Sequence, residues 1–353
     1  MKRHLNSMLT AAALFASLCL FSVPAAAQRG GGAPEPAGCP APPDWYVQRQ
    51  AAQAGARGGG GAGGGRAAAP AAGAPGAAAA GGGGGRGAGG GGGRGGGGRG
   101  GGAAAAQPPV PRIPNEPAYG VQAGKPDFGG LAKGVWNVPY IVNIQTDAHD
   151  ENGCRFIQVP FKPAAKTLWE ERYLKNDMKD DPEGFCLPPG IPRMMYTPYP
   201  AQIYQMPDRI VMVYEGAAHV WRLIWMDGRP LPKSIDDINP DFLGYSVGHW
   251  DGDTLVVESM GFNTETWLDA SGHPHGENMR VTEKYTRTSF NNIKLEATIN
   301  DPEYYTKPFT IVTGITWNAN TRGPWTLRGG ELVEYICQEN NRDLQHLGAE
   351  RGK

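Results

Sequence analysis

The sequence predicts an all-β fold in which an antiparallel meander closes into a lipocalin-like barrel, with one helix and proline-rich loops. Apolar and polar residues alternate most clearly over 293–300, and this period of two gives a strand one buried face and one solvent-exposed face. The turn Asp251-Gly252-Asp253 separates two apolar runs and is a hairpin signal. The short spacing between strands does not suit βαβ units. A two-sheet β-sandwich is the alternative, but closing a barrel removes the exposed strand edges that favour aggregation.

The elements are expected in a simple order along the chain. The first strand is expected over 134–144, where Pro139 restricts it to a sheet edge or a bulge. Apolar residues at helical spacing then predict one amphipathic helix over 164–179, which ends before Pro182. Residues 186–200 are rich in proline and are therefore irregular or extended. Further strands are expected over 209–215, 219–226, 245–250, 254–262, 279–288, 293–300, 308–317 and 331–338.

The N-terminus has the features of a secretory signal peptide over 1–27. Lys2 and Arg3 precede a short apolar run over 8–23, and small residues follow at 25–27. The apolar run is too short to span a membrane comfortably. Cleavage near Ala27 is expected to release a periplasmic or extracellular protein with no transmembrane segment.

Three parts are expected after the signal peptide: a disordered Gly/Ala/Arg-rich tether over 28–126, a β-barrel domain over 127–347 and a disordered tail over 348–353. Residues 55–107 are nearly all glycine and alanine, so they cannot bury enough apolar surface to offset their backbone entropy. Residues 28–112 carry eight arginines against two acids, a net charge of +6. This charge fits a loose attraction to an anionic cell-envelope surface. The absence of aromatic residues for base stacking from residues 55–107 argues against nucleic acid as a partner.

Two features are expected to hold remote parts of the chain together. Four cysteines remain after cleavage, and an even number in an exported chain is compatible with disulfides in three pairings. Cys186 and Cys337 form the preferred pair, because a bond between them ties the proline-rich stretch to a late strand and closes a long loop. Some cysteines could instead be free and buried. The piece 39–50, which contains Trp45 and Tyr46, is apolar enough to dock on the main domain.

A series of uncommon residues falls in a fixed order within 130–340. The series comprises Asp181-Pro182, Cys186-Leu187-Pro188-Pro189-Gly190, Pro192-Arg193, Pro198-Tyr199-Pro200, Gln202-Ile203, Asp227-Gly228-Arg229-Pro230, the run 248–257, Gly261-Phe262-Asn263, Trp267-Leu268-Asp269, Gly272-His273-Pro274-His275 and Asp301-Pro302. In these motifs the chain resembles a group of exported bacterial proteins that is common in soil bacteria. The resemblance implies export and supplies no reaction. The chain departs from the pattern of that group at Tyr245, His249 and Gly276.

The segment His273-Pro274-His275-Gly276-Glu277 is the best candidate for a catalytic or metal-binding site. If it is extended, residues two apart point the same way, so His273, His275 and Glu277 could share one face, with Asp269 one short loop away. Two imidazoles and a carboxylate suit Zn²⁺ or another divalent transition metal. Gly272 and Pro274 favour a turn, however, and the alternative is a hydrogen-bonded structural loop.

Several charged and aromatic residues lie on or beside strands that should bury one face. A buried charge is costly unless it is paired, so a structural ion-pair network is one interpretation. If these groups point into the barrel, its cavity is polar and selects a polar or anionic ligand. The residues predicted to bind a ligand are Arg193, Arg222, Trp250, Trp267, His273, His275 and Glu283.

Three functions are compatible with these observations. The first is an exported barrel that binds a small molecule in its mouth. The second is a metal-assisted hydrolase or isomerase that uses His273 and His275, with Glu277 or Glu283 as a base. The third is a structural protein of the cell envelope. The sequence contains no nucleophile elbow, no phosphate-binding glycine loop in a strand-to-helix context and no CxxC pair.

Overall fold

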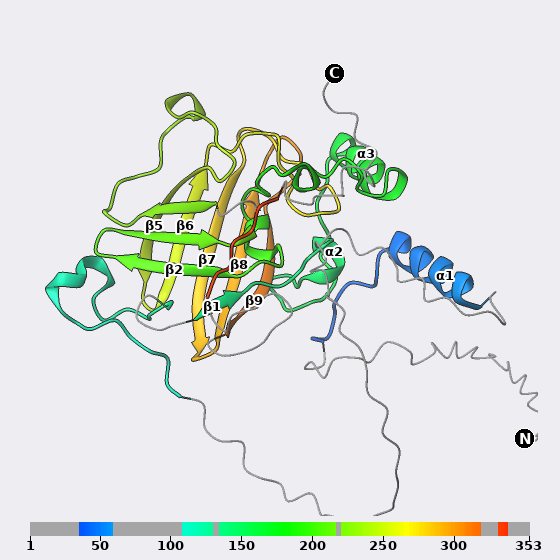
Figure 1. Cartoon of the computed structure of the whole chain (residues 1–353). Coiled ribbons are helices and arrows are strands. Elements are labelled where there is room, and N and C mark those ends of the chain that lie inside the picture. Colours follow the sequence, from blue (N-terminus) through cyan, green and yellow to red (C-terminus); the bar gives the residue numbers. More distant parts are fainter. Residues whose placement is uncertain (1–34, 59–107, 130–133, 217–219, 319–330, 338–353) are drawn as a thin grey trace, which may run out of the picture. The chain divides into compact units, whose positions relative to one another are not determined.

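The computed structural model describes residues 35–58, 108–129, 134–216, 220–318 and 331–337. Within these residues nine strands form a closed barrel, which confirms the all-β prediction (Figure 1). The strands are β1 (Val135–Asn137), β2 (Ala201–Met206), β3 (Arg209–Tyr214), β4 (Trp221–Trp225), β5 (Tyr245–Asp251), β6 (Thr254–Met260), β7 (Arg280–Ser289), β8 (Asn292–Asn300) and β9 (Phe309–Asn318).

The strands pair with their neighbours in chain order, and β1 pairs with β9 to close the barrel. The pairings are antiparallel as predicted, except that β4 and β5 run parallel. The parallel ladder is short and joins Ile224 to Ser246 and Trp225 to Val247. A tight turn can join only antiparallel strands. The long connection over 226–244 returns the chain to the end of the barrel at which β4 begins, so that β5 runs parallel to β4.

Two strand predictions are wrong, and a third is too long, because β1 covers only Val135–Asn137 of the strand expected over 134–144. Residues 201–206 were not expected to form a strand, yet β2 begins directly after Pro200 and buries Ala201 and Ile203. Residues 331–337 were expected to be a strand, but they are irregular. The backbone N–H of Val333 donates to the Glu215 carboxylate at 2.8 Å. This N–H group therefore bonds to a side chain and not to the backbone of a neighbouring strand.

The core of the protein lies inside the barrel. On β8, Ile293, Leu295, Ala297 and Ile299 are buried, and the residues between them are exposed or half-buried, as the alternation predicts. Burying a leucine or isoleucine side chain contributes about 1.5–3 kcal/mol, so the alternation fixes which face of each strand turns inward.

The helices lie in the connections and in the N-terminal segment, outside the strands of the barrel. The predicted helix over 164–179 is observed as α3 (Pro163–Glu170), which continues into the π-helical turn η2 (Glu171–Lys175). Trp169 and Tyr173 are its buried aromatic residues. The other helices are α1 (Asp44–Gly58), α2 (Ile144–Asp147), η1 (Pro117–Gln122), η3 (Pro182–Phe185), η4 (Arg193–Tyr196) and η5 (Ile235–Asp237).

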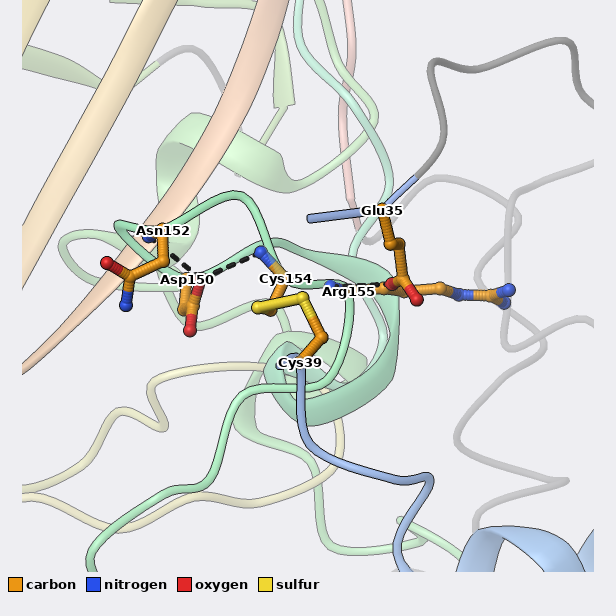
Figure 2. Close-up of a disulfide and its surroundings, with 6 residues drawn as sticks. All are labelled: Glu35, Cys39, Asp150, Asn152, Cys154 and Arg155. Carbon is orange, nitrogen blue, oxygen red and sulfur yellow. Dashed lines mark hydrogen bonds between the residues drawn. A yellow bond between two sulfur atoms is a disulfide. The ribbon is translucent and has the colours of Figure 1, made fainter. Parts of the chain in front are cut away.

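Part of the stretch predicted to be a disordered tether has defined structure. Cys39 forms a disulfide with Cys154, and the Glu35 carboxylate accepts from the backbone N–H of Arg155 at 2.9 Å (Figure 2). The Trp45 ring packs against the rings of Trp169 and Tyr173, with centroids 5.4 Å apart in each pair. This packing confirms that the piece 39–50 docks on the main domain.

Some predictions fall on other parts of the chain. The expected signal peptide over 1–27, the glycine-rich stretch over 59–107 and the tail over 348–353 lie outside the described residues. In the residues that are described, no helix has both the length and the apolar character needed to cross a membrane.

Candidate functional site

A pocket of about 590 Å³ lies where α1, α2 and α3 meet the extended segment 156–161. Four aromatic side chains contribute to its lining, and Gln145 lines it from α2. We call this site the tryptophan pocket. Its lining includes Trp45, Gln48, Gln145, Phe156, Phe161, Lys166, Trp169, Glu170 and Thr306.

His273 lies directly behind this lining. Its ring stacks on Phe161 with centroids 5.2 Å apart and tilts against Trp169 at 5.4 Å. Its Nε2 is 3.2 Å from Nε2 of Gln145. The pocket is therefore lined by side chains that contact the predicted histidine loop, although His273 itself is fully buried.

Asp269 fixes the orientation of the His273 ring. Nδ1 of His273 lies 2.8 Å from Oδ2 of Asp269. Ser271 donates its one hydroxyl proton to Oδ1 of Asp269 at 2.9 Å and accepts from the Trp169 indole at 3.1 Å. Because this hydroxyl proton is engaged, Nδ1 of His273 is placed to donate to the Asp269 carboxylate. Nε2 then accepts from the Gln145 amide, with the amide oriented as in the structure.

The Asp269 carboxylate is buried and fully hydrogen-bonded. Its oxygens also accept from the backbone N–H groups of Ile144 at 2.8 Å and of His273 at 3.3 Å. Burial alone would raise the pKa of Asp269, but His273 and these N–H donors outweigh it and hold the pKa below its usual value. The pair is thus a carboxylate that orients an imidazole whose Nε2 faces Gln145.

His275 points to different partners. Its Nε2 lies 2.7 Å from the Thr266 hydroxyl, and its Nδ1 lies 3.2 Å from the carbonyl oxygen of Gly276. Burial lowers the pKa of His275, and the Gly276 carbonyl and the Asp301 carboxylate oppose this effect only in part. His275 is therefore neutral in the folded protein at neutral pH.

Acid is expected to destabilise the protein through His275. The unfolded chain takes up a proton as the pH falls through about 6.5, whereas the folded chain does not until a lower pH. The stability that this group contributes is therefore present above pH 6.5, and up to about 1.4 kcal/mol is lost between pH 7.5 and 5.5. Urea unfolding of the wild type and of His275→Gln at both pH values measures this loss.

The exposed His249 on β5 supplies the matched control. His249→Gln should lose as much stability on acidification as the wild type, and His275→Gln should lose less. Equal losses of stability in the wild type and both variants would contradict the assignment of the acid effect to His275.

The four predicted metal ligands do not converge. Asp269 and His273 are in contact, but His275 faces Thr266, and Glu277 is exposed to solvent. Among the residues described here, no group of three or more His, Cys, Asp or Glu side chains is arranged to hold a metal ion. The metal site therefore stays a prediction without support from this geometry.

The other predicted charges form two ion-pair groups, one fully buried around Arg222 and one partly buried around Arg193. Nη2 of Arg222 on β4 lies 2.5 Å from Glu283 on β7 inside the barrel. Nη2 of Arg193 lies 2.6 Å from Asp181 and 2.8 Å from Glu183. Burial raises the pKa of Glu183 to about 7, although Arg193 opposes this shift. These contacts agree with the ion-pair interpretation.

The hydroxyl groups around Arg222 complete one network. Arg222 donates from Nε to Ser246 at 3.1 Å and from Nη2 to Ser259 at 2.8 Å, and Tyr285 donates to Glu283 at 2.7 Å. Burial, and after it the Glu283 carboxylate, raise the pKa of Tyr285 well above its usual value, so its hydroxyl stays a donor.

The two predicted tryptophans are engaged in separate contacts. Trp250 stacks on Phe128 with centroids 5.8 Å apart and donates to Gln122 at 3.0 Å. Trp267 is buried, with the Arg172 guanidinium 4.7 Å from its ring centroid. Neither residue is part of the lining of the tryptophan pocket.

Comparison with known proteins adds no assignment, since no family model, curated protein or solved structure matches the chain. The site therefore rests on its own geometry. Sequence reasoning missed Gln145 and Phe161, because nothing in their local sequence distinguishes them. Trp169 was predicted only as part of a helix stripe, and Trp45 only as part of a docking piece.

Proposed function

We propose that the protein is an exported β-barrel protein that binds a small, neutral, partly aromatic molecule in the tryptophan pocket. The observation that carries the proposal is the pocket itself, with Trp45 and Trp169 in its lining and Gln145 bonded to the buried His273. Pockets that bind small molecules typically have volumes of about 300–1,000 Å³ and apolar linings with a few placed polar groups.

The charges in the lining disfavour an anionic ligand. Nζ of Lys166 lies 3.8 Å from Oε1 of Glu170, so these two charges largely cancel. Asp44 adds a further negative charge. An anionic ligand would lose its hydration without gaining an uncompensated cation, whereas aromatic rings can stack on Trp45 and Trp169.

Export is supported by the sequence features of residues 1–27 and by two disulfides among the described residues, Cys39–Cys154 and Cys186–Cys337. Disulfides persist in oxidising compartments. Intact-mass measurement of the protein from the periplasmic fraction and the medium is expected to give a chain that starts at Gln28. A chain that keeps residues 1–27 and stays in the cytoplasm would contradict export.

Binding is tested with N-phenyl-1-naphthylamine, a neutral aromatic amine whose fluorescence rises in apolar surroundings. The wild type is expected to bind it saturably, and Trp45→Ala to bind it at least about tenfold more weakly, a change of about 1.4 kcal/mol. Trp45 is only half-buried, and the Cys39–Cys154 disulfide keeps its segment attached. The substitution should therefore leave the barrel folded.

Trp221→Ala is the matched control, because Trp221 is exposed on β4 and does not line the tryptophan pocket. Its affinity for the probe should equal that of the wild type. Absence of saturable binding, or equal affinity in Trp45→Ala and the wild type, would overturn the proposal. Once the probe site is established, fractions of an envelope extract that displace the probe would lead to the natural ligand.

An enzymatic function has less support. The Asp269–His273 pair could orient a general base, but Nε2 of His273 is bonded to Gln145 and the ring has no exposed surface. A substrate would reach this nitrogen only if Gln145 moved. The metal-assisted version additionally needs the four ligands to converge, which they do not do here.

A further inference from the structure

Gln145 is the polar side chain at the inner end of the tryptophan pocket. The buried residues of the lining are Gln145, Phe156, Ile157 and Trp169. The other polar residues of the lining are exposed or half-buried and form the mouth; they are Asp44, Gln48, Gln158, Lys166, Glu170 and Thr306. A molecule that fills the pocket therefore meets apolar side chains and the Gln145 amide at its inner end.

The buried pair of Asp269 and His273 sets the direction in which this amide points. Nδ1 of His273 lies 2.8 Å from Oδ2 of Asp269, and an imidazole ring that donates from Nδ1 is left with Nε2 as an acceptor. The amide nitrogen of Gln145 lies 3.2 Å from this acceptor, whereas an amide oxygen in the same place would meet a lone pair. The amide nitrogen is thus held toward His273, and the amide oxygen is turned away from it.

The oxygen of the Gln145 amide is open to the pocket. Within the described ranges Oε1 of Gln145 has no hydrogen-bond partner. The unpartnered side-chain atoms that have lost their accessible surface are different ones, namely Nε2 of Gln122, Nδ2 of Asn143 and Nη1 of Arg222. Oε1 of Gln145 therefore keeps accessible surface. Gln145 exposes only 7% of its surface and lines the tryptophan pocket, so this oxygen faces the pocket.

We propose that the tryptophan pocket selects a ligand that donates a hydrogen bond, an aromatic alcohol or an aromatic amine, and that Oε1 of Gln145 is the acceptor. This inference rests on the proposed function, since it assigns the ligand class of the same pocket. The ring of the ligand lies against Trp169, and its O–H or N–H group points to Gln145. A ligand without a donor would displace water from this oxygen and leave it unpaired, and a site of this kind discriminates strongly against such an analogue.

Two probes that differ at one position separate this proposal from simple burial of an aromatic ring. 2-Naphthol carries a hydroxyl group, and 2-methoxynaphthalene replaces the hydroxyl proton with a methyl group. The ether lacks the donor and has more apolar surface, so the hydrophobic effect alone favours the ether. Equilibrium dialysis of the purified protein is expected to show that 2-naphthol binds at least about fivefold more tightly than the ether.

Substitutions at two glutamines of the same lining test whether Gln145 is the acceptor. Gln145→Met keeps the approximate volume of the side chain and removes the amide, so the affinities for the two probes should come within about twofold of each other. Gln48→Met is the matched control, because Gln48 is exposed at the mouth, and it should keep the wild-type preference. Gln145→Glu retains an acceptor oxygen and should also keep the preference. The wild type and Gln145→Glu decide the case if Gln145→Met does not fold.

The proposal is overturned if the wild type binds the ether as tightly as 2-naphthol or more tightly. It is also overturned if Gln145→Met keeps the preference, or if Gln48→Met or Gln145→Glu loses it. Trp45→Ala should weaken binding of both probes and keep the preference, because Trp45 contributes a ring and not the acceptor. Failure of the proposed function gives a different result, since N-phenyl-1-naphthylamine would then not bind saturably. If only the present inference fails, that probe still binds and the preference for the alcohol is missing.

Discussion

Replacing Glu283 with alanine is expected to destabilise the protein by about 3–5 kcal/mol, because it leaves the Arg222 guanidinium buried without a counter-charge. The side chain of Arg222 is 1% exposed and that of Glu283 is fully buried, so water cannot replace the lost carboxylate. Tyr285 also loses its acceptor at the same time. Urea unfolding followed by far-ultraviolet circular dichroism measures the change.

A double replacement tests whether the lost counter-charge is the cause. Arg222→Met together with Glu283→Leu removes both charges and keeps apolar volume in the barrel. It should therefore destabilise the protein clearly less than Glu283→Ala alone. If the double variant is as unstable as the single one, packing and not charge explains the loss.

The matched control lies on the outer face of the same barrel. Nζ of Lys294 is 3.0 Å from Oε1 of Glu296 on β8, and both side chains are partly exposed. Exposed pairs of this kind contribute about 0–1 kcal/mol, so Glu296→Ala should change stability by less than about 1 kcal/mol. A comparable loss in both alanine variants would show that burial does not decide the effect.

The barrel was predictable because its signals are local. The alternation over 293–300 requires only that one face is buried, and β8 follows it residue by residue. The parallel pairing of β4 with β5 was not predictable, because it depends on the path of the connection over 226–244. The β2 strand was missed since prolines before Ala201 masked its start.

The histidine loop shows why the predicted site was only partly correct. Prediction of a shared face for His273 and His275 assumed an extended segment. Gly272 instead has a φ of +90°, and the backbone N–H of Leu268 donates to the His273 carbonyl at 2.9 Å, so a turn leads into His273 and the segment belongs to no strand. The turn directs His273 to Asp269 and His275 to Thr266.

Long-range contacts account for the rest of the site. Gln145 is 128 positions from His273 in the sequence, and Trp45 is 124 positions from Trp169. No periodicity or motif connects such positions. The disulfide Cys186–Cys337 was predicted because cysteines in an exported chain carry a pairing constraint that other residues lack.

Removing that disulfide, with Cys186→Ser and Cys337→Ser together, is expected to destabilise the protein by about 3–5 kcal/mol. The bond closes a loop of 151 residues, for which the chain-entropy model gives about 5 kcal/mol. Non-reducing thermal and urea unfolding of the oxidised variant and the wild type measure the loss.

The disulfide Cys39–Cys154 provides the comparison, because its separation of 115 residues gives nearly the same entropy term, also about 5 kcal/mol. Any difference between the two losses of stability should therefore come from the contacts that each disulfide holds in place.

Without Cys39–Cys154, α1 is attached mainly by aromatic contacts of Trp45 and by the ion pair between Arg49 and Asp177 at 3.1 Å. Its removal should weaken N-phenyl-1-naphthylamine binding, whereas removal of Cys186–Cys337 should lower stability and leave probe binding to the folded protein unchanged. Equal loss of probe binding in both variants would mean that the tryptophan pocket depends on global stability and not on the position of α1.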